Sequence, residues 1–167
     1  MQNRISRWIM TLLLAVGVTA LVTACASTKA GKEKEDATER VSLADLPMPA
    51  RATVEKLTGG GKVEMIDKEV EKGKTVYDVE ATVGGKHVEY TIAIDGAVVG
   101  TETNIEYNEL PEAVRAAAEK YFGTATGLNP SVGVEDGRTT YEVEGTKNGK
   151  KVVATFDPTG KFIGEEK

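Results

Sequence analysis

The amino-acid sequence predicts an α+β fold of two tandem repeats, each a helix packed on an antiparallel β-meander of three to four strands. Residues 46–102 align without a gap to residues 110–166, and 22 of the 57 aligned pairs are identical. Helix, turn and strand signals recur in that register, as in internal repeats. Each copy also has a glycine turn between two alternating runs, Gly84-Gly85 and Asn148-Gly149, which is typical of a β-hairpin. We place the two repeats at residues 43–104 and 105–167.

The chain begins with a predicted signal peptide at residues 1–24. Residues 1–7 carry two arginines and no acid, and residues 8–24 are mainly apolar or small. This is the n-region and h-region pattern of a secretory signal. An uncleaved membrane anchor is the alternative, because this run of 17 residues is at the lower limit of the roughly 17–25 residues that span a bilayer.

The only cysteine, Cys25, follows Val22-Thr-Ala, and this stretch resembles the lipobox of bacterial lipoproteins. The resemblance implies that Cys25 is lipidated, with palmitate among its acyl chains, and that it tethers the protein to a membrane. Ala26, rather than aspartate, follows it. In the lipoprotein family this implies retention in the outer membrane, facing the periplasm or the cell surface, where the organism has one.

Residues 25–42 are predicted to form a flexible tether. They have almost no apolar content and carry both signs of charge, so they cannot bury enough surface to order the chain. A tail that recognises charge is the alternative interpretation.

A helix opens each repeat. Pro47 and Pro111 suit a first helical turn, where the missing N–H is not needed, and Gly59 and Gly123 suit the left-handed residue that ends a helix. Candidate N-cap residues are Asp45 in the first repeat and Asn108 or Glu109 in the second.

The predicted strands follow each helix. In the first repeat they begin at residues 62–70, and in the second they include residues 140–146, 151–156 and 161–164. The segment 128–134 contains Pro130, which favours an edge strand or a bulge. One face of each strand is apolar, so we expect a sheet covered by helices on one side and exposed to water on the other. Whether the sheets of the two repeats are continuous stays open.

Composition restricts the chemistry. The net charge of −5 argues against nucleic acid binding. With one histidine and one cysteine, zinc or thiol–imidazole chemistry has almost no ligands, and no intramolecular disulfide can form. We therefore predict no cofactor, no metal, no catalytic residue and no enzymatic activity.

Two pairs of carboxylates, Asp78/Glu80 and Glu142/Glu144, are predicted on outward faces of equivalent strands. They could serve as acid and base or as calcium ligands. A solvated surface is the interpretation we adopt, because catalytic carboxylates need unlike environments. His87 aligns with Lys151 and is interpreted as a surface residue.

Two further clusters have simple interpretations. The turns of the second repeat are rich in lysine, at positions 147, 150, 151 and 161, which could contact an acidic partner or protect a sheet edge from aggregation. Gly59-Gly-Gly61 precedes Lys62 but follows a helix and lacks the spacing of a phosphate-binding loop.

A family resemblance is carried by Tyr141-Glu-Val-Glu, Asn148-Gly-Lys and Asp157-Pro-Thr-Gly-Lys-Phe-Ile163. These motifs resemble the PepSY and PepSY-like domains of secreted bacterial proteins. The first repeat keeps Tyr77-Asp-Val-Glu, Gly84-Gly-Lys and Asp95-Gly but lacks a lysine after Gly96. The resemblance implies a helix packed on an antiparallel sheet, and no catalytic residues. Some relatives are protease propeptides or protein inhibitors, including tandem β-lactamase inhibitors.

The resulting hypothesis is a lipid-anchored, non-catalytic envelope protein whose repeats bind another protein, with inhibition as one form of that binding. The alternative is a structural or assembly role in the envelope without a discrete client. The partner is not identified by the sequence. The predicted partner-binding face consists of Glu80, His87, Glu89, Thr91, Glu142 and Glu144.

Overall fold

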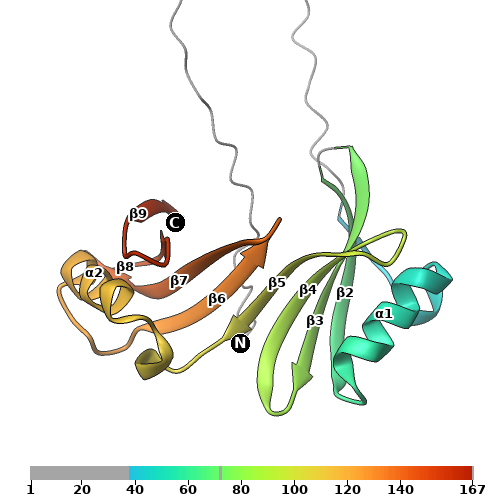
Figure 1. Ribbon diagram of the computed structural model, residues 1–167, viewed down its shortest axis with the longest axis horizontal. Coiled ribbons are helices and arrows are strands. Elements are labelled where there is room, and N and C mark those ends of the chain that lie inside the picture. Colours follow the sequence, from blue (N-terminus) through green and yellow to red (C-terminus); the bar gives the residue numbers. More distant parts are fainter. Residues whose placement is uncertain (1–37, 72, 167) are drawn as a thin grey trace, which may run out of the picture. The chain divides into compact units, whose positions relative to one another are not determined.

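The computed structural model describes residues 38–71 and 73–166, whose strands form one antiparallel sheet in the order of the chain (Figure 1). The strands are β1 (Glu39–Arg40), β2 (Lys62–Glu71), β3 (Lys74–Val83), β4 (Lys86–Ala93), β5 (Val98–Asn104), β6 (Asn129–Glu135), β7 (Arg138–Lys147), β8 (Lys150–Phe156) and β9 (Phe162–Glu166). The helices are α1 (Met48–Thr58) and α2 (Glu112–Phe122), preceded by the 3₁₀ turns η1 (Leu43–Asp45) and η2 (Tyr107–Glu109).

The prediction of two separate helix-on-meander repeats is wrong. Strand β5 pairs with β6 from Gly100↔Glu135 to Asn104↔Ser131, so a single sheet of nine strands runs through the described residues. The physical reason lies in the edges. A meander ends in an edge strand with unpaired N–H and C=O groups, and pairing two such edges satisfies both.

Strand β6 is also not the edge strand that its proline suggested. It lies between β5 and β7. Pro130 is the second residue of the strand, and its carbonyl accepts a hydrogen bond from the Ile105 N–H (3.0 Å). Because β5 has already ended at Asn104, the missing N–H of the proline falls beyond the β5–β6 ladder and interrupts no bond in it.

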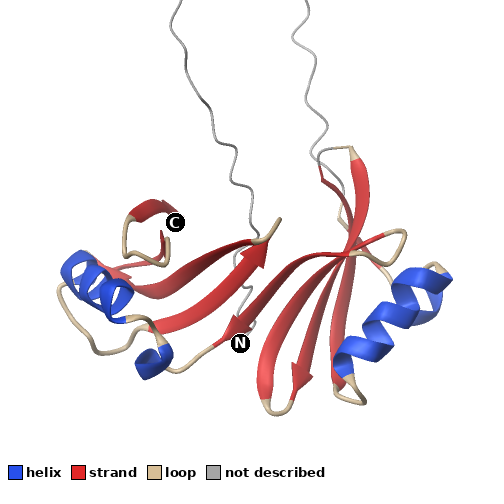
Figure 2. Cartoon of the chain, in the orientation of Figure 1, coloured by secondary structure: helices blue, strands red, loops and turns tan. Residues whose placement is uncertain are grey.

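The two helices cover one face of the sheet, α1 over β3 and β4 and α2 over β7 and β8 (Figure 2). Gly59 (φ 58°) and Gly123 (φ 73°) end them in the left-handed conformation, as predicted. The predicted N-caps are wrong, because the capping positions are Pro47 and Pro111.

The acidic residues that were predicted as N-caps close the 3₁₀ turns instead. The Asp45 carboxylate accepts a hydrogen bond from the Ser42 N–H (2.9 Å), and the Glu109 carboxylate accepts one from the Glu106 N–H (2.6 Å). Each carboxylate reaches back three residues, as the acid of a capping box does.

Each helix forms its own core with the strands beneath it. Residues Ala50 and Val54 of α1 and Val114 and Ala118 of α2 are fully buried. The first cluster consists of Leu46, Ala50, Val54, Ile66, Tyr77, Val79, Val88, Tyr90 and Ile92. The second consists of Leu110, Val114, Ala118, Leu128, Val143, Ala154 and Phe156. Because mainly valine and alanine face the sheet, the helices lie close to it.

The predicted signal peptide at residues 1–24 and the tether, apart from residues 38–42, lie outside the described residues, as does Cys25. The boundaries proposed for the two repeats stay a prediction. Within the part of the chain that the structure describes, no helix has the length and apolar character needed to cross a membrane.

The turn after β8 brings Gly160 against the start of α2. Gly160 has φ 81°, and a Cβ atom at this position would lie 2.4 Å from the Ala113 carbonyl oxygen. We expect Gly160→Ala to lower the unfolding free energy by about 2–4 kcal/mol, because it adds a backbone clash to an unfavourable φ angle. Urea denaturation followed by circular dichroism measures this loss.

The matched control is Gly149→Ala in the β7–β8 hairpin. Gly149 also has a positive φ (76°), but no atom lies within 4 Å of an added Cβ. Only the backbone cost of about 1 kcal/mol applies there. Equal losses in both variants would show that the contact with Ala113 does not constrain α2.

Candidate functional site

The face of the sheet opposite the helices carries a concentration of carboxylates. Because side chains alternate along a strand, Tyr77, Val79 and Ala81 point toward α1 while Asp78 and Glu80 point to the other side. We call this helix-free side the acidic face. It continues across the β5–β6 junction to Glu142 and Glu144 on β7.

Three glutamates lie directly opposite one another on consecutive strands. Glu80 on β3 is paired in register with Glu89 on β4, and Glu89 is paired with Glu102 on β5. We call these three residues the central row. Like charges at directly opposed positions destabilise a sheet, so this arrangement costs folding free energy unless a proton or a cation offsets the repulsion.

Next to the central row, β6 and β7 contribute a second set of buried polar groups. Ser131 lies opposite Glu142, and its hydroxyl donates a hydrogen bond to Glu102 Oε1 (2.6 Å). Glu102, Ser131 and Glu142 are each at most 7% exposed. The pairing of β5 with β6 therefore brings together groups that are separated by up to 40 residues.

The carboxylates of this face are not equally solvated, contrary to the prediction. Burial, with the added charges of Glu102, Asp78 and Glu80, raises the pKa of Glu89 to about 8. Burial, together with the charges of Glu102 and Glu166, raises the pKa of Glu142 to about 9. Both carboxyls therefore hold a proton over much of the neutral range, because desolvation and like charges disfavour the ionised form.

Other predicted members of the face have local partners. The Thr91 hydroxyl donates to Asp78 Oδ1 (2.8 Å), and Lys151 Nζ lies 2.9 Å from Glu144 Oε1. Burial raises the pKa of Glu80, while the charge of His87 lowers it. All six residues of the predicted partner-binding face thus occur on one side of the sheet.

His87 is not the simple surface residue that its alignment with Lys151 suggested. It is half-buried opposite Thr82 on β3. Its Nε2 atom is buried and, among the described residues, has no hydrogen-bond partner. A buried polar atom without a partner carries a desolvation cost.

Glu102 was missed in the sequence. It lies in Thr101-Glu102-Thr103, after the last strand of the first predicted repeat, and nothing local distinguishes it from a solvated residue. Its importance depends on the pairing of β5 with both β4 and β6. The alternation of threonine and glutamate was the one available signal that Glu102 points away from the helices.

Three carboxylates converge near the β2–β3 hairpin, where no metal was predicted. Oxygen atoms of Glu69, Glu71 and Asp78 lie within 4.8 Å of one another. Hard oxygen ligands of this kind suit divalent cations such as Ca²⁺. Each of the three also has another interaction, for example the hydrogen bond that the Thr38 hydroxyl donates to Glu69 Oε1 (3.0 Å).

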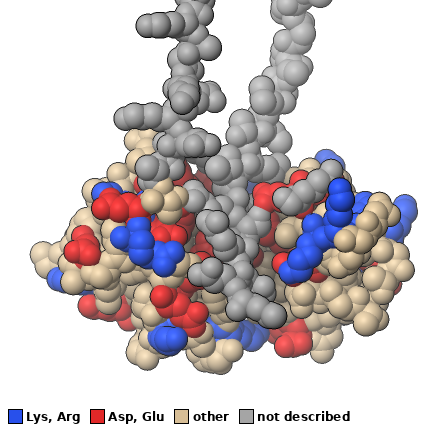
Figure 3. Space-filling view, turned by 180° about the vertical axis from the view of Figure 1, so that it is seen from behind, with Lys and Arg blue, Asp and Glu red and all other residues tan. Residues whose placement is uncertain are grey.

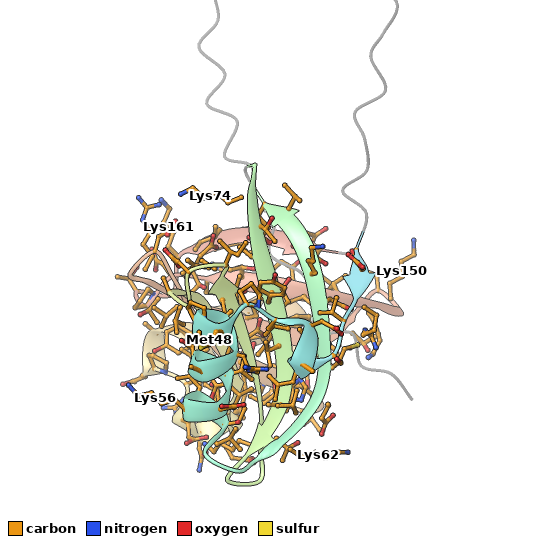
Figure 4. All side chains as sticks on the ribbon, turned by 90° about the vertical axis from the view of Figure 1, so that its right-hand side faces the viewer. Met48, Lys56, Lys62, Lys74, Lys150 and Lys161 are labelled. Atoms are coloured by element: carbon orange, nitrogen blue, oxygen red, sulfur yellow. The ribbon has the colours of Figure 1, made fainter. Side chains whose placement is uncertain are left out.

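The lysine-rich turns do not form one patch. Lys147 Nζ lies 3.3 Å from the centroid of the Tyr121 ring, a cation–π contact. Figure 4 shows Lys150 and Lys161 on opposite sides of the view. Acidic and basic side chains are interspersed over the visible surface in Figure 3. Gly59–Gly61 forms the loop after α1, as expected.

Comparison with known proteins shows the fold. The structure is similar to a protein of Bacteroides eggerthii provisionally assigned to the periplasm (TM-score 0.58, 17% identity, 72% of this chain and 88% of that one). It is also similar to a DUF2874 family protein of Bacteroides uniformis (TM-score 0.55, 17% identity, 72% of this chain and 88% of that one). A BLIP-like protein of Bacteroides fragilis has a similar structure as well (TM-score 0.52, 21% identity, 72% of this chain and 85% of that one).

No protein-family model and no curated protein matches the chain. At these identities the structural neighbours show a shared fold, which agrees with the fold implied by the PepSY-like motifs.

The raised pKa values predict how stability depends on pH. The folded chain holds protons on Glu89 and Glu142 that the unfolded chain releases near pH 4.5. The unfolding free energy should therefore decrease as pH rises from about 5 toward 9. We expect Glu89→Gln/Glu142→Gln to remove most of this decrease, because the two raised pKa values produce it, as measured by urea denaturation at pH 5, 7 and 9.

The control for this experiment is Glu55→Gln, which changes an exposed carboxylate on α1. It should leave the pH dependence of wild type unchanged. If the double variant and wild type give parallel curves of unfolding free energy against pH, the two carboxyls are ionised in the folded protein.

Proposed function

We propose that this chain is a non-catalytic protein of the bacterial cell envelope that binds another protein through the acidic face of its sheet. Inhibition of an enzyme is one form that such binding takes, and the similarity to a BLIP-like protein favours it. The proposal combines the fold, the export signal in the sequence and the chemistry of the acidic face.

The observation that carries the proposal is the central row. Glu80, Glu89 and Glu102 are opposed in register on a face that no helix of the described residues covers. A sheet is more stable with threonine or valine at such positions. Departures from local stability are expected where a protein contacts its ligand, so the row is better explained by recognition than by folding.

The described residues favour a binder over an enzyme. Thr82 lies opposite His87 in the sheet. Its hydroxyl donates a hydrogen bond to Glu64 Oε1 (2.8 Å) and not to the imidazole of His87. A small cavity of about 210 Å³ beside β5 and the β6–β7 turn is lined mainly by valine, glycine and threonine, with Asp136 as its charged residue. A catalytic pocket needs several convergent polar groups.

An envelope location is supported by two independent features. Cys25 follows a signal-like segment in a lipobox-like sequence, and a structural neighbour is provisionally assigned to the periplasm. We propose that acyl chains on Cys25 hold the protein at the outer membrane, since two or three chains give stable anchoring where one is marginal.

A structural role is the second candidate. Among the strands of the described residues, β9 pairs with β8 alone and forms one edge of the sheet, and Phe162 on this strand is 44% exposed. An open edge can add a strand from another chain. Self-association through β9 would support an assembly role without a separate client.

Photo-crosslinking in cells tests the binding function. A photoreactive residue placed at Glu144 on the acidic face should trap one dominant protein, and one placed at Met48 should not. Met48 is 74% exposed and points outward from the start of α1 (Figure 4). Mass spectrometry identifies what is trapped. Copies of this chain alone, or the same products from both positions, would favour the structural role.

Cys25→Ser tests the anchor. Removing the thiol removes the acyl acceptor, so the variant should lose its lipid and move from the membrane fraction to the soluble or precursor fraction. Metabolic labelling with palmitate and fractionation measure both effects. A labelled, membrane-bound Cys25→Ser protein would exclude Cys25 as the lipidation site.

A further inference from the structure

We propose that the partner contacts the acidic face with a segment that carries arginine or lysine, and that one of these cations binds between Glu80, Glu89 and Glu102 beside His87. This inference rests on the proposed function, because it names the chemistry of the partner that the face recognises.

The distribution of charge supports a cationic partner. Two neighbouring rows of paired residues, Glu80–Glu89–Glu102–Gly133–Thr140 and Asn104–Ser131–Glu142–Thr155, contain no lysine or arginine. Basic side chains of the same face lie nearer its margins, where Arg40 pairs with Asp67 (2.6 Å) and Lys151 with Glu144 (2.9 Å). Arg40 acts on the central row through Glu80, and among the described residues of these two rows the ionisable groups are all carboxyls, so the centre of the face favours a cation.

The hydrogen-bonding capacity of the face favours the same ligand. The hydroxyl groups of Thr91 and Ser131 already donate to Asp78 (2.8 Å) and Glu102 (2.6 Å). What the centre offers is therefore mainly the carboxylate oxygens of the central row, which only accept hydrogen bonds when they are ionised. A guanidinium brings five donors and no acceptor, and an ammonium brings three.

Proton balance supplies a third argument. The charges that raise the pKa of Glu89 are those of Glu102 on β5, Asp78 and Glu80 on β3, and Glu69 on β2. His87 precedes Glu89 on the same face of β4. With its pKa near 8, Glu89 holds a proton at neutral pH when no cation is bound. A cation favours the ionised form, so binding should release a proton from Glu89 to solvent.

A separate partner fits better than the chain's own N-terminal segment. The chain first enters the described structure near the acidic face, where Thr38 donates to Glu69. The preceding residues include Lys29, Lys32 and Lys34, but Glu33, Glu35 and Asp36 balance them. A segment without net positive charge is a weak match for this face.

The experiment uses isothermal titration calorimetry on the mature chain from residue 25 with Cys25→Ser. The probe is a synthetic twelve-residue glycine–serine peptide with three arginines, and its matched control has citrulline in place of each arginine. At pH 7 and low salt, the arginine peptide should bind at least tenfold more tightly. Its apparent binding enthalpy should also vary with the ionisation enthalpy of the buffer, as expected for proton release.

Two double variants with equal changes in charge test the location. Glu89→Gln/Glu102→Gln should weaken the arginine peptide at least tenfold and abolish the buffer dependence. Glu55→Gln/Glu112→Gln, which changes exposed acids on the two helices, should change affinity less than threefold. Circular dichroism verifies that both variants fold. Equal binding of the citrulline peptide, or equal losses in the two variants, would overturn the proposal.

Two further results separate this proposal from its alternatives. If Lys29→Gln/Lys32→Gln/Lys34→Gln raises the affinity of the arginine peptide more than tenfold, the chain's own segment is the occupant and the proposal is wrong. If photo-crosslinking from Glu144 traps a protein that the arginine peptide cannot displace, the binding function stands and the cationic contact is refuted. If the peptide binds as expected but no partner is trapped, the cation site stands without the proposed function.

Discussion

The pairing of β5 with β6 joins the two halves of this protein into one sheet. Five residue pairs, from Gly100↔Glu135 to Asn104↔Ser131, join the strands around α1 to the strands around α2. Without them each set would end in an unpaired edge, which is a site for aggregation. The same pairs bring Ser131 within hydrogen-bond distance of Glu102. They also bring Glu142 close enough to Glu102 for the charge of Glu102 to raise the pKa of Glu142. One ladder of backbone hydrogen bonds thus creates both the continuous sheet and its acidic face.

The two faces of the sheet have opposite effects on the stability of the fold. On the covered face, small and branched residues let each helix lie close to its strands, and the turns at Gly96 and Gly160 approach the helix N-termini so closely that a Cβ would meet backbone atoms at 2.7 and 2.4 Å. On the other face, carboxylates are opposed in register and partly withdrawn from water. The apolar packing on the first face supplies the stability that offsets the electrostatic cost on the second.

Protonation makes that cost tolerable. With pKa values of about 8 and 9, Glu89 and Glu142 are largely neutral near pH 7, so the face carries less charge than its composition indicates. A carboxyl held neutral by burial and like charges changes its protonation when a cation approaches. Recognition and folding stability would then respond to the same protons. This coupling distinguishes the acidic face from an ordinary solvated surface, on which charges lie far apart and water screens them.

Much of the local structure could be predicted from the sequence, although the N-caps of the helices could not. Glycines predicted the ends of both helices, and Asn148-Gly149 predicted a hairpin. The alternation of side chains predicted that Glu80, Glu89 and Glu142 lie on the side away from the helices. These features could be predicted because they depend on neighbouring residues alone. Strand pairing in the folded chain, by contrast, makes β6 an interior strand, joins the two meanders into one sheet and adds Glu102 and Ser131 to the acidic face. Those outcomes depend on which strand edges pair. Edges pair through backbone N–H and C=O groups, which nearly every residue has, so the side-chain pattern of the sequence does not predict the pairing. The burial of Glu142 and of His87 Nε2 follows from that pairing and the packing around it, and so was invisible in the sequence.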